Sequence, residues 1–170
     1  MKKILLGLAA AAALAAPIAV AGSANAAPAP TPKATGSVTW TVGDVTGTVR
    51  FDANNKTGGT LDYQASNGMW LHGFVTPGSY QKIDARTAVF AGEITSGSDD
   101  YTVHHDGTDY FTVKVVDGST SGRDGDIIAV LANMDGHGQW LKGADADTTR
   151  DYPMTNTTAG IVTAGNLTVH

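Results

Sequence analysis

Short segments in which apolar and polar residues alternate recur along the chain from residue 37 onward. A period of two is typical of half-buried β-strands, whose side chains point to opposite faces in turn. The most regular segment covers residues 110–116, where Phe111, Val113 and Val115 share one face. Beyond residue 26, no stretch of the sequence keeps the 3.6-residue apolar period of a helix over three turns. The chain is therefore predicted to be all-β.

Thr and Val, which favour strands, are abundant in this region, and Gly, Asp and Asn separate the alternating segments. The predicted strands cover residues 37–42, 45–52, 60–64, 69–76, 80–84, 88–95, 101–105, 110–116, 126–133 and 167–170. Short strands at this spacing predict a single-domain antiparallel β-sandwich or barrel of roughly 8–10 strands. A hairpin is predicted around Asp106-Gly107. A strict two-residue loop would pair Val103 with Tyr110, whereas a loop one residue longer, which we prefer, pairs Val103 with Phe111 and Tyr101 with Val113.

The first 26 residues have the three parts of an export signal. A basic pair at residues 2–3 precedes an apolar run at residues 4–20, and the Ala-Asn-Ala at residues 24–26 supplies the small side chains that a signal peptidase needs. The apolar run is short and has no basic flank after it, so we expect cleavage before Ala27 rather than a membrane anchor. The mature protein is then expected to be secreted, from a bacterium, and to leave the membrane.

The chain divides into residues 1–26 as the signal peptide, residues 27–35 as a Pro/Ala-rich tether, and residues 36–170 as one all-β domain. The tether is expected to be extended because its prolines interrupt both helix and sheet. Residues 143–160 show weak periodicity and are expected to form a long surface loop before the last strand.

Charged residues are sparse, at 16%, and the formal net charge is −5. Loss of the signal takes it to −7, because 9 basic residues then face 16 acidic ones. Nucleic acid is therefore excluded as an expected partner, since phosphate binding requires clustered Lys and Arg. The sequence has no cysteine, which excludes disulfides, thiolate catalysis and Cys-based metal sites.

Four segments, at residues 61–73, 87–95, 109–133 and 164–170, resemble in this order the post-COAP type of all-β domain of secreted bacterial proteins. The residues that match its motifs are Gly68, Met69 and His72; Ala88, Phe90 and Gly92; Phe111, Thr112, Val113, Val115, Asp117, Gly122, Arg123 and Asp126; and Gly165, Asn166 and His170. The resemblance implies an extracellular β-domain without an assigned reaction, and it supplies no catalytic residues. For His72 and His170 it implies a structural hydrogen-bonding role.

The turn at residues 117–126 is rich in Asp and Gly and has two interpretations. In the first, Asp117, Asp124 and Asp126 supply acidic ligands to a calcium ion, which prefers six to eight oxygen ligands. In the second, which we prefer, Asp117 and Asp126 accept backbone N–H bonds and Arg123 pairs with one of them, while Gly122 allows the chain to turn. Apart from this calcium possibility, no cofactor is expected.

Trp70 is the best candidate for a ligand contact. Met69 and Leu71 lie beside it in the predicted strand and point to the opposite face, so the indole is expected to face solvent. Exposed aromatic rings can stack on sugars or bind proteins, although most aromatic residues in a β-domain pack in its core. The expected partner is an extracellular ligand, either a glycan or a protein.

Nothing in the sequence singles out a catalytic residue. The G-x-S-x-G motif of many serine hydrolases is absent, and the 15 aspartates make a carboxylate pair easy to imagine but hard to assign. We therefore expect a secreted, non-catalytic β-domain that acts as an extracellular binding or structural module. The alternative is a secreted hydrolase that acts on glycan or peptide with Asp and His side chains.

Overall fold

The computed structural model describes residues 31–98, 108–118, 125–133, 143–155 and 158–170. The prediction of an all-β fold is confirmed. The strands are β1 (Lys33–Val42), β2 (Val45–Asn54), β3 (Gly58–Ala65), β4 (Trp70–Val75), β5 (Gln81–Lys82), β6 (Thr87–Gly97), β7 (Tyr110–Val116), β8 (Ile127–Ala132) and β9 (Gly160–Val169). One 3₁₀ turn, η1 (Ala146–Thr149), completes the described elements.

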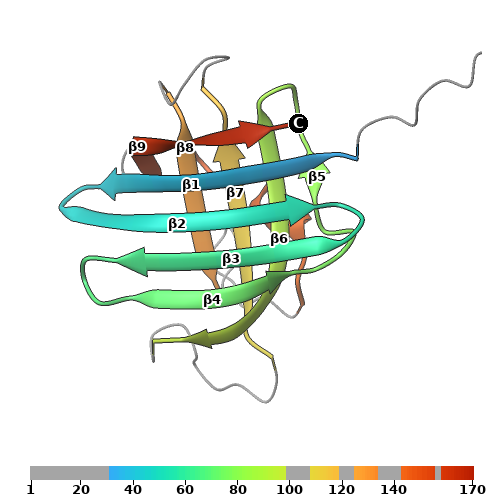
Figure 1. Cartoon of the computed structure of the whole chain (residues 1–170), viewed down its shortest axis with the longest axis horizontal. Helices are drawn as coiled ribbons and strands as arrows, with labels where there is room; N and C mark the ends of the chain where they lie inside the picture. The colour runs from blue at the N-terminus through green and yellow to red at the C-terminus, as the bar shows by residue number, and fades with distance from the viewer. Residues whose placement is uncertain (1–30, 99–107, 119–124, 134–142, 156–157) are drawn as a thin grey trace, which may run out of the picture.

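The strands pair in the order β4-β3-β2-β1-β9-β8-β7-β6-β5, and a further pairing between β4 and β6 closes the sheet. The result is a closed barrel of eight antiparallel strands, with β5 added at the side of β6. The prediction left sandwich and barrel open, and the closing pair decides for the barrel. In Figure 1, β1 to β4 lie side by side in front, and β6 to β8 cross them behind.

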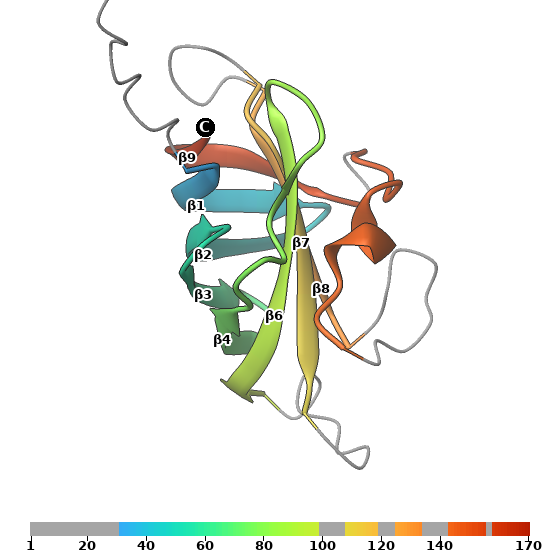
Figure 2. The same ribbon diagram turned by 90° about the vertical axis from the view of Figure 1, so that its right-hand side faces the viewer.

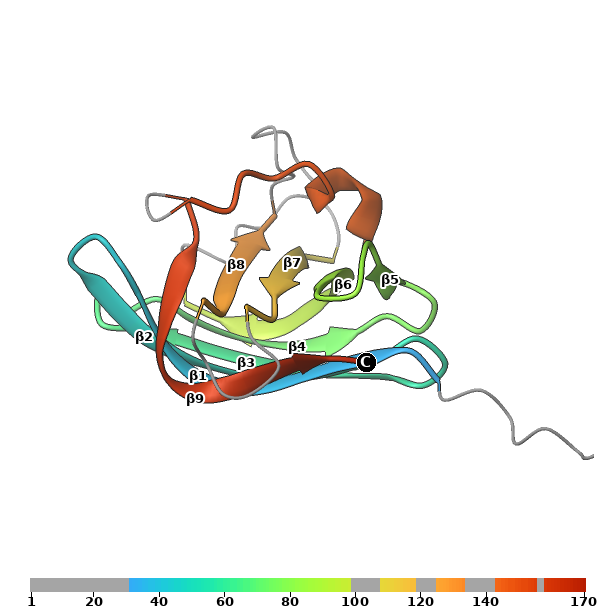
Figure 3. The same cartoon turned by 90° about the horizontal axis from the view of Figure 1, so that it is seen from above.

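Two strands connect these layers. β6 pairs with β7 through Thr87–Glu93 and with β4 through residues 92–97, so Gly92 has a partner on each side, Phe111 and Val75. β9 pairs with β1 along most of its length, but it pairs with β8 through only two residues, Ile161 and Gly160. The β8–β9 ladder is thus the shortest ladder around the barrel. Figures 2 and 3 show the two layers, β1–β4 and β6–β8, from the side.

The barrel interior is filled by aromatic rings that lie over glycines. A Cβ atom on Gly92 would lie only 2.5 Å from Cζ of Phe111, and one on Gly47 only 2.6 Å from Cζ2 of Trp40. Phe51 covers Gly36 in the same way. Each glycine leaves room for the ring of its register partner on the neighbouring strand, so the core depends on glycines as much as on rings.

The start of β1 and the end of β9 lie side by side. The N–H of His170 donates to the carbonyl of Lys33 at 2.9 Å. The hydroxyl of Tyr80 donates to the same carbonyl at 3.2 Å. Burial of the Tyr80 ring raises the pKa of its hydroxyl to about 12.

Residues 143–155 do more than form the surface loop that was expected. η1 lies on the side of β6–β8 that faces away from β1–β4 (Figure 2). Ala146 packs there with Val89 and Ala91 in a second apolar cluster. The ammonium of Lys114 donates to the carbonyls of Arg150 and Tyr152 at 2.5 and 3.0 Å. Both faces of β6 are therefore covered, which explains its continuous run of buried residues.

Two expected boundaries need correction. β1 begins at Lys33, inside the stretch 27–35 assigned to the tether, because residues 33–35 pair with β2 and residues 34–35 also pair with β9. β9 begins at Gly160, seven residues before the predicted strand at 167–170. Both extensions are rich in Gly, Ala and Thr and lack apolar alternation.

The hairpin pairing predicted for Phe111 and Val113 is wrong. Phe111 pairs with Gly92 and Ala132 instead, and Val113 pairs with Phe90 and Val130, so both edges of β7 are occupied. Residues 101–105 lie outside the described residues, as does the predicted signal peptide. Within the described part of the chain, no helix has the length and apolar character needed to cross a bilayer.

Candidate functional site

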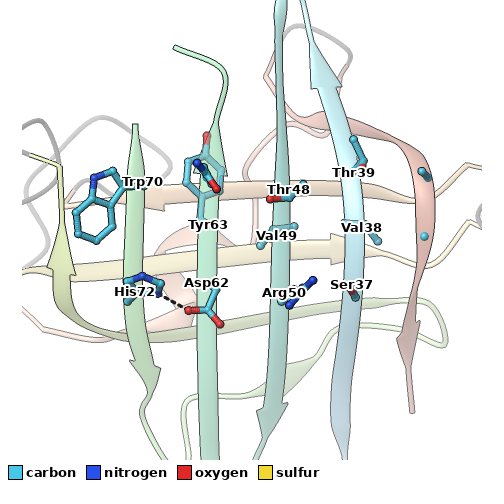
Figure 4. A pocket seen from close by; sticks show the side chains of 13 residues that line it. Ser37, Val38, Thr39, Thr48, Val49, Arg50, Asp62, Tyr63, Trp70 and His72 are labelled. Carbon is cyan, nitrogen blue, oxygen red and sulfur yellow. Dashed lines mark hydrogen bonds and ion pairs between the residues drawn. The ribbon is translucent and has the colours of Figure 1, made fainter. Parts of the chain in front are cut away.

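A shallow depression of about 920 Å³ lies on the outside of the barrel. It is lined by residues of β1, β2, β3, β4 and β9, on the side of these strands that faces away from the barrel interior. We call this surface the outer face. Figure 4 shows side chains of β1, β2, β3 and β4 around the depression.

A row of polar side chains crosses the outer face. Strand register places Ser37 beside Arg50, Arg50 beside Asp62, and Asp62 beside His72. Directly paired residues of antiparallel strands project on the same side of the sheet, so these four side chains form one line. Ser96 of β6 continues the line as the register partner of His72.

Asp62 and His72 contact each other through the carboxylate Oδ1 and the imidazole Nδ1 (Figure 4). Each side chain is about half exposed. With Nδ1 held by the carboxylate, a neutral His72 presents Nε2 to solvent as an acceptor, and a protonated one presents it as a donor. The pair therefore fixes the ring and leaves one nitrogen for a ligand.

Aromatic side chains run along β4 on the same face. Trp70 is 37% exposed and Phe74 is 44% exposed, and His72 lies between them in the sequence. The rings of Trp70 and His72 pack edge-to-face, with centroids 5.4 Å apart. The alternate residues Leu71 and Val75 are buried in the core, which holds the three rings on the outside.

Hydrogen bonds at the strand ends keep β4 in place. The Trp70 N–H donates to Oγ of Ser98 at 3.3 Å, and the Ser98 N–H donates to the Trp70 carbonyl at 2.9 Å. Gly68, in the turn before β4, has a φ of +91°, a conformation that glycine adopts readily. The backbone under Trp70 is therefore fixed by neighbours on both sides.

The predicted aspartate turn lies elsewhere, between β7 and β8. Asp126 is fully buried. Its Oδ1 accepts the Gly118 N–H at 3.0 Å, and its Oδ2 accepts the Leu167 N–H at 3.2 Å. Oδ2 of Asp117 accepts the Val169 N–H at 3.4 Å. Both carboxylates therefore tie the turn to β9, where β9 has no ladder to β8.

The other residues named for this turn, Gly122, Arg123 and Asp124, lie outside the described residues. Within the described ranges, no group of three His, Asp or Glu side chains is placed to hold a metal ion. The carboxylate oxygens of Asp126 are directed at backbone N–H groups, which is the arrangement that the structural interpretation requires.

Three ionisable groups away from the outer face have shifted pKa values. Desolvation lowers the pKa of Lys114, and it raises the pKa of Tyr152. The N–H of Arg86 donates to the carboxylate of Asp84 and lowers its pKa. These groups lie on or beside β5 to β7 and η1, so they serve the packing of residues 143–155 and the turn before β6.

Of the residues on the outer face, only Trp70 was predicted as a contact for ligand. Its exposure agrees with the alternation of its strand. His72 was expected to form a structural hydrogen bond, and it does contact Asp62. Asp62 and Arg50 were missed, because the register that brings them beside His72 depends on turn lengths that alternation does not specify.

Comparisons of the chain with models of protein families, with curated proteins and with solved structures found no match. The resemblance to post-COAP-type domains therefore stays a prediction.

Proposed function

We propose that this chain is a secreted, non-catalytic bacterial β-domain that works as an extracellular binding module, with its ligand on the outer face. The export signal predicted at residues 1–26 and the resemblance to post-COAP-type domains support the extracellular setting. The binding role rests on one observation. Two large aromatic side chains, Trp70 and Phe74, are exposed on either side of the Asp62–His72 pair.

Thr also favours strands and would not expose apolar surface to water, so a purely structural face does not require exposed aromatic rings at these positions. The Asp62–His72 pair adds an oriented hydrogen-bonding group between the rings. Apolar surface beside a few oriented polar groups is typical of ligand sites.

The test is a comparison of three proteins on arrays of glycans and of extracellular proteins. The proteins are the wild type, the double variant Trp70→Ala/His72→Ala, and the control Ile83→Ala. Ile83 is as exposed as Trp70, at 37% each, but it directly follows β5, which pairs with β6 and does not line the depression. A ligand that binds the wild type and the control, and not the double variant, supports the proposal. Equal binding by all three, or no ligand at all, overturns it in favour of a structural module.

A hydrolase remains the second candidate because Asp62, His72 and Ser96 are register neighbours in the order of a catalytic triad. Within the described residues, no hydrogen bond joins the Ser96 side chain to the His72 imidazole, and all three side chains lie exposed. A nucleophile needs its base within hydrogen-bonding reach and a site that excludes water. Turnover of ester, glycan or peptide substrates that is lost in both Ser96→Ala and His72→Ala would favour this candidate over binding alone.

A further inference from the structure

The strands beneath the aromatic side chains have no free backbone edge. β3 pairs with β2 and β4, and β4 pairs with β3 and β6. A ligand on this part of the outer face therefore cannot add itself as an extra strand, which is a common way for peptides to bind a sheet. Recognition must rely on side chains alone.

Each outward residue of β4 has a polar neighbour on β3. The register pairs Trp70 with Gln64, His72 with Asp62, and Phe74 with Thr60. Each ring on β4 therefore has a polar residue directly across from it on β3, and the Cβ atoms of such a pair lie about 5 Å apart. A flat ligand that stacks on the ring meets a polar group at its edge.

A sugar ring has this pair of properties. Its C–H bonds form an apolar face, which is attracted to the negative face of an aromatic ring, and its hydroxyl groups project from the edge as donors and acceptors. A protein partner would instead require a broad apolar centre to bury, of the kind that interface cores have. Here the neighbours of Trp70 and Phe74 are Gln64 and Thr60.

Charge on the outer face disfavours acidic ligands. Arg50 is accompanied by three exposed carboxylates, those of Asp52, Asp62 and Glu93. Among the described residues, Arg50 forms no ion pair, so its guanidinium is available to donate to a neutral oxygen. A polyanion would meet net repulsion at this surface.

The spacing of the rings indicates a chain rather than a single sugar. Trp70 and Phe74 are four residues apart on one strand, which corresponds to about 13 Å at 3.3 Å per residue. This span exceeds one pyranose ring, and His72 lies between the two stacking positions.

We propose that the outer face binds a neutral polysaccharide that lies along β4, a proposal that rests on the binding role proposed above. Trp70 and Phe74 each stack on one sugar unit. Gln64, Asp62 and Arg50 donate to or accept from hydroxyl groups, and Nε2 of His72 contacts the unit between the rings.

The experiment is native gel electrophoresis of the purified protein in gels that contain one soluble polysaccharide. Hydroxyethyl cellulose, arabinoxylan and laminarin are the neutral probes, and alginate is the acidic one. We expect at least one neutral probe to retard the wild type and alginate to leave its mobility unchanged. Trp70→Ala and Phe74→Ala should each weaken the retardation about tenfold, which corresponds to about 1.4 kcal/mol. Ile83→Ala should behave like the wild type.

Two further variants keep the test independent of folding. Gln64→Ala and Asp62→Asn change the polar neighbours and leave both rings in place, and they should weaken retardation while melting temperatures stay close to that of the wild type. Retardation that survives in Trp70→Ala and Phe74→Ala would overturn the proposal, because the sugar would then bind elsewhere.

The outcomes separate this proposal from the binding role itself. If none of the neutral probes retards the protein, and a protein or peptide on the arrays binds in a Trp70-dependent way, the polysaccharide is wrong and the binding module stands. If no ligand of any class depends on Trp70, both proposals fail.

Discussion

The carboxylate of Asp126 accepts a hydrogen bond from the backbone N–H of Leu167, at 3.2 Å, although the two residues are 41 positions apart in the chain. β9 has left the β8 ladder by this point, since only Ile161 and Gly160 pair with β8. A buried N–H without an acceptor is costly. A side chain therefore supplies the acceptor that a neighbouring strand supplies elsewhere in the barrel.

Substitution of Asp126 by Ala should lower the free energy of unfolding by about 2–5 kcal/mol, because the N–H groups of Gly118 and Leu167 lose their acceptor. Asp126→Asn keeps one carbonyl oxygen and should lose less. Thermal melts in chelator and in millimolar calcium should agree for every protein. A wild-type melt that chelator lowers, with an Asp126→Ala melt that it does not affect, would establish the calcium interpretation instead.

Phe111→Ala should lower the free energy of unfolding by about 3–5 kcal/mol. The ring is fully buried and fills the space above Gly73 and Gly92, so its removal leaves a cavity. Denaturant unfolding measures the loss. Phe74→Ala is the control, because that ring is exposed and its removal should cost about 0.5 kcal/mol or less. Equal losses in the two variants would contradict the core position of Phe111.

Gly92→Ala should cost about 3 kcal/mol or more, since the added Cβ would lie 2.5 Å from Cζ of Phe111 and closer still to the carbonyl oxygen of Phe74. Backbone on one side and a ring on the other leave no direction for relief. Gly143→Ala is the matched control, because a Cβ there meets nothing within 4 Å. Similar melting temperatures for both variants would argue against the fit of ring over glycine.

Tyr80→Phe should change the dependence of stability on alkaline pH. The pKa of the hydroxyl is raised from 10.0 to about 12 by burial, so between these values the unfolded chain has lost a proton that the folded chain keeps. The contribution of Tyr80 is thus complete below pH 10 and declines as pH rises toward 12, by up to about 1.4 kcal/mol per unit.

Melts of the wild type and Tyr80→Phe at pH 9 and pH 11 check this expectation. The wild type should lose more stability than the variant between the two values. At pH 9, where the hydroxyl is protonated, the variant should be about 1 kcal/mol less stable because it lacks the bond to the Lys33 carbonyl. An identical decline in both proteins would place the alkaline sensitivity in other groups.

The sequence was informative where one face of a strand is apolar. Residues 110–116 were predicted as a strand with the bounds that β7 has, because Phe111, Val113 and Val115 all point inward. The beginning of β9 gave no such signal. Its residues between Gly160 and Asn166 lie at a bulged edge with mostly exposed side chains, so few of them need to be apolar.

The candidate site was accessible to sequence reasoning only in part. The outward position of Trp70 follows from its buried neighbour Leu71. The contact between Asp62 and His72 does not, because it depends on which residues of β3 and β4 pair. A shift of one position would turn one of the two side chains inward. Closure of the barrel through β4 and β6 could not be predicted either, because another predicted strand, at residues 80–84, lies between these two in the sequence.

The meeting of Lys33 and His170 at one end of the β1–β9 ladder has a mechanical consequence. A force that draws these two residues apart would act on the end of the ladder and load its hydrogen bonds one after another. Antiparallel strands resist far better when the load runs along them and is shared by all their bonds. Tension applied at Lys33 and His170 would therefore separate β1 from β9 one hydrogen bond at a time, starting at this end of the ladder. The hydrogen bond from Tyr80 to the Lys33 carbonyl would be among the first to bear the force.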